Sequence, residues 1–206
     1  MRGKFFTFEG IDGAGKSTHI AWTAELLRSQ GLSLVLTREP GGTAFGENLR
    51  ELLLRHTQPI HPISEALLMF AARKQHVEEV IRPALDKGAW VLCDRFTDSS
   101  FAYQGGGRGV ARDRLETLES WVHADLQPDL TLLFDVDISV GQSRVARIKS
   151  PDRFEQESSD FFARVRSAYL ERARRAPERI FLIDGSQPIA SIREQIEKRV
   201  QALRAL

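Results

Sequence analysis

The sequence predicts an α/β fold in which a five-stranded parallel sheet carries helices on both faces. Five short apolar runs alternate along the chain with longer amphipathic segments, and glycine or proline stands between many of them. Strands that alternate with helices form parallel sheets through right-handed crossovers. The length of 206 residues, 42% of them hydrophobic, suits one domain with a sizeable core.

Each expected strand is a short run of apolar residues. The first contains three phenylalanines and stops at Gly10, and its length together with the glycine favours a strand over a helix. The second follows Gly31 and the third follows Gly88, whereas the last two end at Asp135 and Asp184. The expected strands are residues 4–9, 32–37, 89–93, 130–135 and 179–184.

The longer segments carry apolar residues at helical spacing. Gly31 marks the end of the first helix, because glycine adopts the backbone that closes helices. Pro83 is expected to break the third, since proline lacks a backbone N–H. A glycine-rich turn at residues 105–109 is expected before the fourth. Trp22, Trp90 and Trp121 fall within expected elements and are expected in the core. The expected helices are residues 16–30, 47–55, 64–87, 110–126, 139–147, 158–175 and 189–206.

A charged segment near the C-terminal third is the candidate for a mobile lid. Residues 149–155 are rich in charge and contain Pro151, so they are expected to form a loop. No internal repeat or low-complexity linker divides the chain. We therefore expect a single domain over residues 1–206, with a short lid at about residues 147–157 inside it.

Composition argues against several classes of protein. The net charge of +1 disfavours a nucleic-acid binder, because such proteins carry a basic excess. No apolar run reaches the ~18 residues that cross a membrane, and the first residues lack the apolar core of a signal peptide. Cys93 is the only cysteine, which suits a reducing compartment. We expect a soluble cytoplasmic protein without nucleic-acid or membrane partners.

A phosphate-binding loop is the strongest motif in the chain. Residues 10–17 match G-x-x-x-x-G-K-[ST] at every fixed position, a pattern that roughly 1% of random chains this long would contain. Lys16 would reach the β- and γ-phosphates of ATP, and the Ser17 hydroxyl would hold Mg²⁺. The motif predicts a P-loop NTPase fold, with the nucleotide bound by Gly10, Ile11, Asp12, Gly13, Ala14, Gly15, Lys16, Ser17 and Thr18.

Charged side chains at the ends of two strands suggest where the metal and the acceptor lie. Asp94 and Arg95 follow the third strand, and ligands bind at the carboxyl ends of open α/β sheets. Asp94 would act on the metal or its waters, and Arg95 would bridge phosphates; a surface ion pair is the alternative. Asp135 is a rival for the metal-side acid, with a structural role equally compatible. Residues 37–43, after the second strand, are predicted to form a substrate loop.

Basic residues gather around the expected lid, namely Arg144, Arg147, Lys149 and Arg153. Phosphoryl transfer spreads negative charge over oxygens, and a mobile arginine that closes on them stabilises the transition state. A basic face in solvent is the ordinary alternative. We expect one or two of these residues to be functional.

Four motifs in this order resemble those of the bacterial thymidylate kinases. They are the phosphate loop followed by Thr-Arg-Glu-Pro-Gly-Gly-Thr at 37–43, Asp-Arg-Phe at 94–96, Tyr-Gln-Gly at 103–105 and Asp-Arg-Phe-Glu-Gln-Glu at 152–157. The resemblance covers nearly the whole chain. It implies direct in-line transfer of the γ-phosphoryl group of ATP to dTMP, making dTDP for nucleotide biosynthesis, with Mg²⁺ held by Ser17 and Asp94. It also implies a homodimer.

The same resemblance implies roles for single residues. Arg50 and Arg95 would hold the phosphate of dTMP. Arg73 would read an edge of thymine, because its guanidinium offers paired donors to a carbonyl acceptor. Tyr103 would pack on the deoxyribose, where its bulk excludes a 2′-hydroxyl. The implied substrate-binding residues are Glu39, Pro40, Arg50, Phe70, Arg73, Arg95, Ser100, Tyr103 and Gln104.

The family divides by the source of its catalytic basic residue. One branch carries it directly after the acid of the phosphate loop, but here Gly13 follows Asp12. The resemblance therefore implies that the lid supplies it, with Arg153 as the leading candidate and Arg147 or Lys149 as alternatives. The implied catalytic residues are Lys16, Arg95, Arg153 and Asp12.

One position departs from the family pattern. A phenylalanine usually stands four residues before the thymine-reading arginine, where it stacks on the base. Here Met69 occupies that position and Phe70 follows it. Either Met69 packs on thymine, or Phe70 does so through a small shift.

Two other functions remain open. One is a kinase for another small acceptor, such as a different nucleoside monophosphate or a deoxynucleoside. The other is a nucleotide-driven switch, although a switch needs no second phosphate pocket. A GTPase is disfavoured because Asn48 is the only asparagine, and the guanine-reading Asn-Lys-x-Asp element is missing.

Overall fold

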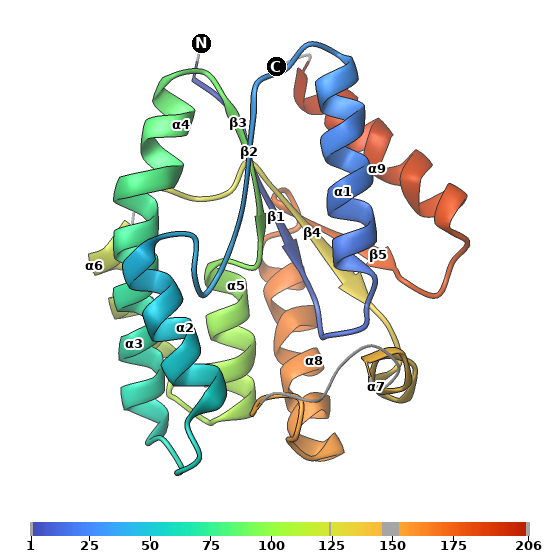
Figure 1. The fold of residues 1–206 in the computed structure, drawn as a ribbon. Coiled ribbons are helices and arrows are strands. Elements are labelled where there is room, and N and C mark those ends of the chain that lie inside the picture. The colour runs from blue at the N-terminus through green and yellow to red at the C-terminus, as the bar shows by residue number, and fades with distance from the viewer. Residues whose placement is uncertain (1, 124, 146–152, 205–206) are drawn as a thin grey trace.

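The computed structural model describes residues 2–123, 125–145 and 153–204, and a five-stranded parallel sheet lies at its centre (Figure 1). The strands lie in the order β2-β3-β1-β4-β5, and each neighbouring pair runs parallel. The expected sheet is thereby confirmed, with small shifts at strand ends. The strands are β1 (Phe5–Glu9), β2 (Leu34–Arg38), β3 (Trp90–Asp94), β4 (Leu130–Asp135) and β5 (Ile180–Asp184).

Helices connect the strands, and several of them extend beyond the end of the sheet toward which the strands point (Figure 1). None of those in the described residues has an apolar stretch long enough to span a membrane. The helices are α1 (Lys16–Ser29), α2 (Ala44–Arg55), α3 (Pro62–His76), the π-helical η1 (Val77–Ile81), α4 (Arg82–Asp86), α5 (Thr97–Ser100), the π-helical η2 (Phe101–Gly107), α6 (Arg112–His123), α7 (Ile138–Val145), α8 (Ser159–Arg175) and α9 (Ile189–Arg204).

Alternate residues of β1 build two cores on opposite faces of the sheet. Phe6 packs with Leu27 of α1, and Phe5 packs with Ile81 of η1; all four side chains are fully buried. Successive strand residues point to opposite faces, so a strand covered on both sides must be apolar throughout. The continuous apolar runs in the sequence follow from this.

The segment from α3 to α4 runs on without a break at Pro83, which corrects the expectation from the sequence. The π-helical η1 connects α3 to α4, and Pro83 stands in the first turn of α4. The π-helical turn before the proline departs from the α-helical hydrogen-bond pattern at the place where the proline lacks its N–H. The proline therefore marks a change of helix type.

The glycines at 105–107 lie in a helix and not in the expected turn. They belong to η2, which packs along α8. A Cβ atom at Gly107 would come within 2.5 Å of the Phe161 ring of α8. The glycines are needed for close approach of two helices, and this approach fixes the part of η2 that lines the site.

Trp121 is a second correction, because it lies on the surface and not in the core. Its side chain is 82% exposed on α6, and Leu67 of the neighbouring α3 is 49% exposed. The buried side of α6 is formed by Leu115, with Leu118 and Val122 packed around it. Trp121 therefore lies outside the core that α6 forms with α3.

Candidate active site

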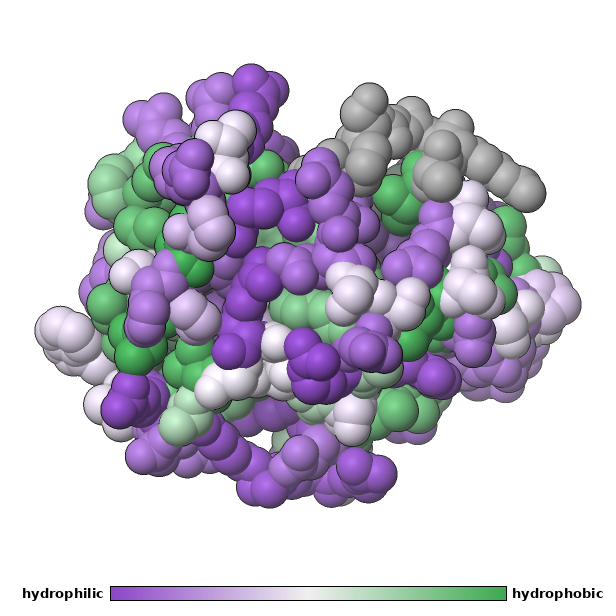
Figure 2. Space-filling model, turned by 90° about the horizontal axis from the view of Figure 1, so that it is seen from below, coloured by the Kyte–Doolittle hydropathy of each residue, from purple (hydrophilic) through white to green (hydrophobic). Residues whose placement is uncertain are grey.

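A cavity opens at the carboxyl ends of the strands, where polar side chains surround a hollow in the surface (Figure 2). It encloses about 690 Å³ of empty space including its mouth, within the range of about 300–1,000 Å³ typical of small-molecule sites. Six separate segments of the chain contribute. The lining residues are Asp12, Glu39, Pro40, Arg50, Leu54, Met69, Arg73, Arg95, Phe96, Ser99, Ser100, Tyr103, Gln104, Phe154 and Glu155.

The phosphate loop joins β1 to α1, as the motif predicts. Lys16 is buried, and its Nζ donates to the backbone oxygens of Gly10 at 3.1 Å and Ile11 at 2.9 Å. Burial and the nearby charge of Arg95 lower the pKa of Lys16. Ser17 lies exposed in the first turn of α1. The loop thus presents a lysine, a hydroxyl and a helix N-terminus together.

The structure explains why no basic residue follows Asp12. Gly13 has a φ of 78°, a conformation that side chains rarely adopt. A Cβ atom there would lie 2.2 Å from the backbone oxygen of Gly141 in α7. An arginine at this position would require α7 to move away, so the positive charge must come from elsewhere.

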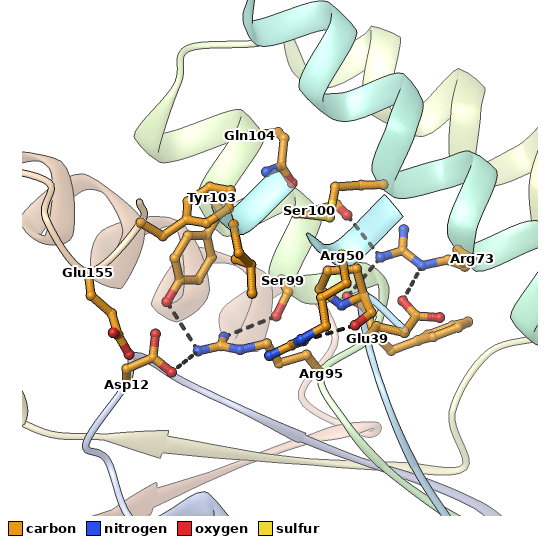
Figure 3. A pocket seen from close by; sticks show the side chains of 15 residues that line it. Asp12, Glu39, Arg50, Arg73, Arg95, Ser99, Ser100, Tyr103, Gln104 and Glu155 are labelled. Carbon is orange, nitrogen blue, oxygen red and sulfur yellow. Dashed lines mark hydrogen bonds and ion pairs between the residues drawn. The ribbon is translucent and has the colours of Figure 1, made fainter. Parts of the chain in front are cut away.

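Arg95 stands between the phosphate loop and the cavity (Figure 3). Its Nη2 donates to Asp12 Oδ1 at 2.8 Å and to the Tyr103 hydroxyl at 3.2 Å. Its Nη1 donates to the Tyr169 hydroxyl at 3.0 Å and to Ser99 Oγ at 3.3 Å. The backbone has a φ of 72°, a strained conformation that persists only where the surroundings enforce it. Strain of this kind concentrates at functional sites, and here it aims one guanidinium.

Arg73 occupies the opposite end of the cavity (Figure 3). Its Nε donates to Glu39 Oε2 at 2.7 Å, and its Nη2 donates to Ser100 Oγ at 2.9 Å. Its Nη1 is buried without a hydrogen-bond partner among the described residues. A buried guanidinium N–H seldom lacks an acceptor, so this atom is suited to a ligand.

Glu39 is held on its second oxygen as well. His76 Nδ1 lies 3.0 Å from Glu39 Oε1, and His76 Nε2 lies 2.6 Å from Thr37 Oγ1. Burial raises the pKa of Glu39, but Arg73 and His76 outweigh it and bring that pKa below its ordinary value. Glu39 therefore stays ionised and keeps Arg73 in place.

The remaining expected acceptor residues meet at the same cavity, with one exception. Arg50 Nη1 donates to the backbone oxygen of Pro40 at 2.9 Å, and Gln104 Nε2 donates to Glu65 at 2.9 Å. Phe70 is the exception, because it is 1% exposed and does not line the cavity. Its ring lies under Arg73, at 4.6 Å from the guanidinium carbon.

Met69 is the residue of the pair that faces the cavity. Adjacent positions on an α-helix differ by about 100° in direction, so Met69 and Phe70 of α3 cannot share one wall. Of the two candidates named from the sequence, Met69 lines the cavity and Phe70 does not. The expected place of Phe70 in the site is thereby corrected.

Arg153, the leading candidate for the catalytic lid residue, contacts α2 and α3 in this structure. Its Nη2 donates to the fully buried Glu65 at 2.6 Å, and its Nε donates to the backbone oxygen of Leu53 at 2.7 Å. Arg147 and Lys149, its alternatives, lie outside the described residues. Arg144 of α7 does contact the phosphate loop, where its Nη1 donates to the backbone oxygen of Gly13 at 3.1 Å.

The two candidate metal-side acids differ in their surroundings. Asp135 receives two hydrogen bonds from Arg166, at 2.6 and 2.8 Å, and so forms a complete ion pair. Asp94 has a buried Oδ1 with no hydrogen-bond partner in the described part of the chain. A buried carboxylate oxygen without a donor fits a metal ion or its water better, which favours Asp94.

Four residues of the site had little or no signal in the sequence. Ser99, Tyr169, Glu65 and His76 belong to none of the motifs, and each acts through a partner distant in the chain. Ser99 alone had a weak signal, since it stands one helical turn after Arg95. Tyr169 contacts Arg95 across 74 positions of sequence, which no local pattern reveals.

The fold and the site together define a class of protein. A phosphate loop faces a second cavity that contains three arginines, one of them fixed beside the loop. That arrangement is typical of a P-loop kinase that passes a phosphoryl group to a small phosphorylated acceptor.

Comparison with known proteins gives the family. A family model described as thymidylate kinase matches residues 8–196. Thymidylate kinase of Nitrosomonas europaea is 60% identical over 98% of this chain and 94% of its own, and that of Cupriavidus necator is 57% identical over 98% and 100%. A crystal structure of thymidylate kinase from Ehrlichia chaffeensis superposes with a TM-score of 0.80, at 34% identity over 98% of this chain and 99% of that one.

The chain belongs to the thymidylate kinase family. Family membership assigns it the ATP-dependent phosphorylation of dTMP to dTDP. The fold expected from the sequence is also confirmed by the solved relative.

We predict unequal losses of stability for substitutions of the neighbours Met69 and Phe70. Phe70→Ala should lower the free energy of unfolding by about 3–5 kcal/mol, because it leaves a cavity in a packed core. Met69→Ala should cost less than about 2 kcal/mol, since its side chain already borders open space. Urea denaturation measures both, and equal losses would contradict the assigned directions of the two side chains.

Proposed function

We propose that dTMP occupies the cavity with its phosphate at Arg95 and its base at Arg73. One observation carries this proposal: the cavity has a fixed cation beside the phosphate loop and an unsatisfied donor at its far end. A nucleoside monophosphate has a dianion at one end and base acceptors at the other. The acceptor is thereby oriented with its phosphate toward ATP.

The phosphate end brings the donor and acceptor sides together. Asp12 pairs with Arg95 at 2.8 Å and lies 3.8 Å from Lys16 Nζ. Arg50 lines the same cavity. We assign Arg95 and Arg50 to the dTMP phosphate and Lys16 to the β- and γ-phosphates of ATP. These cations would stabilise the charge that develops on the transferred group.

The base end selects by hydrogen bonds and by shape. Arg73 Nη1 is assigned to a carbonyl oxygen of thymine, and Ser100 and Gln104 lie beside it in the lining. Met69 gives an apolar surface for the ring. Tyr103 is assigned to the deoxyribose, because its ring lines the cavity while its hydroxyl is engaged by Arg95. A ribose 2′-hydroxyl there would meet an aromatic ring and no acceptor.

Ser17 and Asp94 form a fitting pair for Mg²⁺. Mg²⁺ is usually held by one or two protein oxygens together with substrate phosphates and waters. The unpartnered Oδ1 of Asp94 and the exposed hydroxyl of Ser17 supply that number of oxygens. The ion would neutralise phosphate charge when bound.

We infer that the chain forms one kinase domain. Within it, Arg153 secures the described end of the lid to α3. Its ion pair with Glu65 shares that carboxylate with Gln104 of the base end. Among the described basic residues of the lid region, Arg144 has the contact with the phosphate loop, so it is the better candidate for a role at the ATP phosphates.

Because the reaction consumes ATP, we also infer a cytoplasmic location.

An acceptor panel tests the proposed function. Release of ADP from Mg·ATP should be stimulated strongly by dTMP, less by dUMP, and little by dGMP, dCMP or thymidine. Lys16→Ala should lower kcat by about 100-fold or more, because a positioned cation contributes several kcal/mol to the transition state. Preference for dGMP or thymidine over dTMP would sink the assignment of the cavity.

Two lid-region variants separate the roles of the basic residues. Arg144→Ala should lower kcat at saturating dTMP by about tenfold, through loss of one charge-assisted contact of about 1.5–3 kcal/mol. Arg153→Ala should act mainly on the KM for dTMP, since its partner carboxylate also holds Gln104. Steady-state kinetics with both substrates varied give the answer, and a fall in kcat confined to Arg153→Ala would restore its catalytic role.

A homodimer that uses α3 and α6 is also proposed. Trp121 and Leu67 are exposed on these adjacent helices, by 82% and 49%. A charged residue in the middle of an apolar interface is strongly unfavourable. Trp121→Glu should therefore sediment as a monomer at concentrations where the native chain and the control Trp22→Phe sediment as dimers; a native monomer would refute the proposal.

A further inference from the structure

Glu9 is a buried carboxylate directly before the phosphate loop. It is the last residue of β1, is fully buried and does not line the cavity. Its Oε1 accepts from the backbone N–H of Phe96 at 2.7 Å. Its Oε2 accepts from Ser99 Oγ at 2.6 Å and from the Tyr169 hydroxyl at 2.9 Å. An ionisable group out of reach of any substrate, yet with three donors, calls for an explanation.

The two hydroxyls on Glu9 also hold Arg95. Ser99 Oγ and the Tyr169 hydroxyl lie 2.8 Å apart, and both accept from Arg95 Nη1, at 3.3 and 3.0 Å. Figure 3 shows the Ser99 hydroxyl pointing toward the Arg95 guanidinium. Glu9 and Arg95 are therefore joined through two shared hydroxyls.

Counting hydrogens shows why the charge of Glu9 matters. A hydroxyl has one hydrogen to donate, and a guanidinium can only donate. While Glu9 is ionised, Ser99 and Tyr169 both turn their hydrogens toward it and leave their lone pairs to Arg95. If Oε2 carried a proton, one hydroxyl would accept it and turn its own hydrogen to the other hydroxyl, 2.8 Å away. Only one hydroxyl would then donate to Glu9, and no negative charge would stand behind the two acceptors of Arg95.

We propose that Glu9 is a positioning residue whose negative charge orients the Ser99 and Tyr169 hydroxyls and thereby fixes Arg95 for the phosphate of dTMP. The inference rests on the proposed function, in which Arg95 binds that phosphate. Glu9, the last residue of β1, would thus contribute to acceptor binding although it does not contact the acceptor.

Charged and titratable groups face Glu9 from all the elements around it. Burial and the charge of Asp98 raise the pKa of Glu9 to about 7. The hydrogen bond from Ser99 and the charge of Arg95 lower this pKa and offset only part of the rise. Because this pKa exceeds that of the unfolded chain, ionising Glu9 lowers stability as the pH rises toward 7. The facing groups are Lys16, Cys93, Arg95, Asp98, Tyr103, Tyr169 and Arg179.

The test is calorimetric binding of dTMP and of thymidine to the native chain and to Glu9→Gln. An amide has the shape of the acid but no charge. At about pH 8.5 it should weaken dTMP about tenfold, the worth of one hydrogen bond to a charged group, and leave thymidine unchanged. Near pH 6 the two proteins should bind dTMP almost equally, since native Glu9 is then protonated. Titration of the dTMP phosphate near pH 6 affects both alike.

A merely structural role gives a different result. It predicts that Glu9→Gln weakens thymidine as much as dTMP, or weakens dTMP equally at both pH values, and either result overturns the proposal. Thermal unfolding at about pH 8.5 is a second readout, where the variant should be at least as stable as the native chain. If Glu9→Gln fails to fold, Tyr169→Phe replaces it and should weaken dTMP several-fold without affecting thymidine.

Arg95→Ala separates failure of this inference from failure of the proposed function. Unchanged affinity of Arg95→Ala for dTMP would refute the proposed function itself. If Arg95→Ala binds dTMP more weakly while Glu9→Gln binds it as tightly as the native chain, the positioning role alone is refuted. If Glu9 acts through Arg95, adding Glu9→Gln to Arg95→Ala should produce no further loss, whereas additive losses would contradict the proposal.

Discussion

The site depends on a guanidinium that cannot move. Arg95 has a strained backbone, and its side chain is fixed by Asp12 of the phosphate loop and by three hydroxyls from η2, α5 and α8. A freely rotating arginine would lose considerable entropy on binding a phosphate. Here the Arg95 side chain is already ordered in the folded protein, so it loses little further entropy on binding. The acceptor phosphate therefore finds a preformed cation beside the loop that binds ATP.

Pairing with a carboxylate recurs with three buried or half-buried arginines of the site. Arg73 is paired with Glu39, Arg95 with Asp12 and Arg153 with Glu65. Buried charges are tolerated only when they are paired and hydrogen-bonded, so these carboxylates allow three guanidinium groups to crowd one region of the molecule. The pairs lie at the base end, the phosphate end and the lid, and each carboxylate comes from a different element of the fold.

The sequence was sufficient where the determinants are local and insufficient where they are not. The phosphate loop and the strands could be predicted, because short patterns specify them. Eight of the nine residues that the family resemblance implied for the acceptor line the cavity. Phe70 does not, because one position on a helix decides which way a side chain points. The ion pair of Arg153 with Glu65, 88 positions away, could not be expected from any local pattern. Glycines 105–107 were read as a turn, although close helix packing requires them.

A crystal structure with dTMP and Mg·ADP bound tests the central claim most directly. The account predicts a phosphate oxygen of dTMP within about 2.7–3.2 Å of an Arg95 nitrogen, with the backbone of Arg95 unchanged from its present conformation. It also predicts that Arg73 Nη1 meets a carbonyl oxygen of thymine. A dTMP molecule bound in the reverse direction, or a phosphate held without Arg95, would contradict the account.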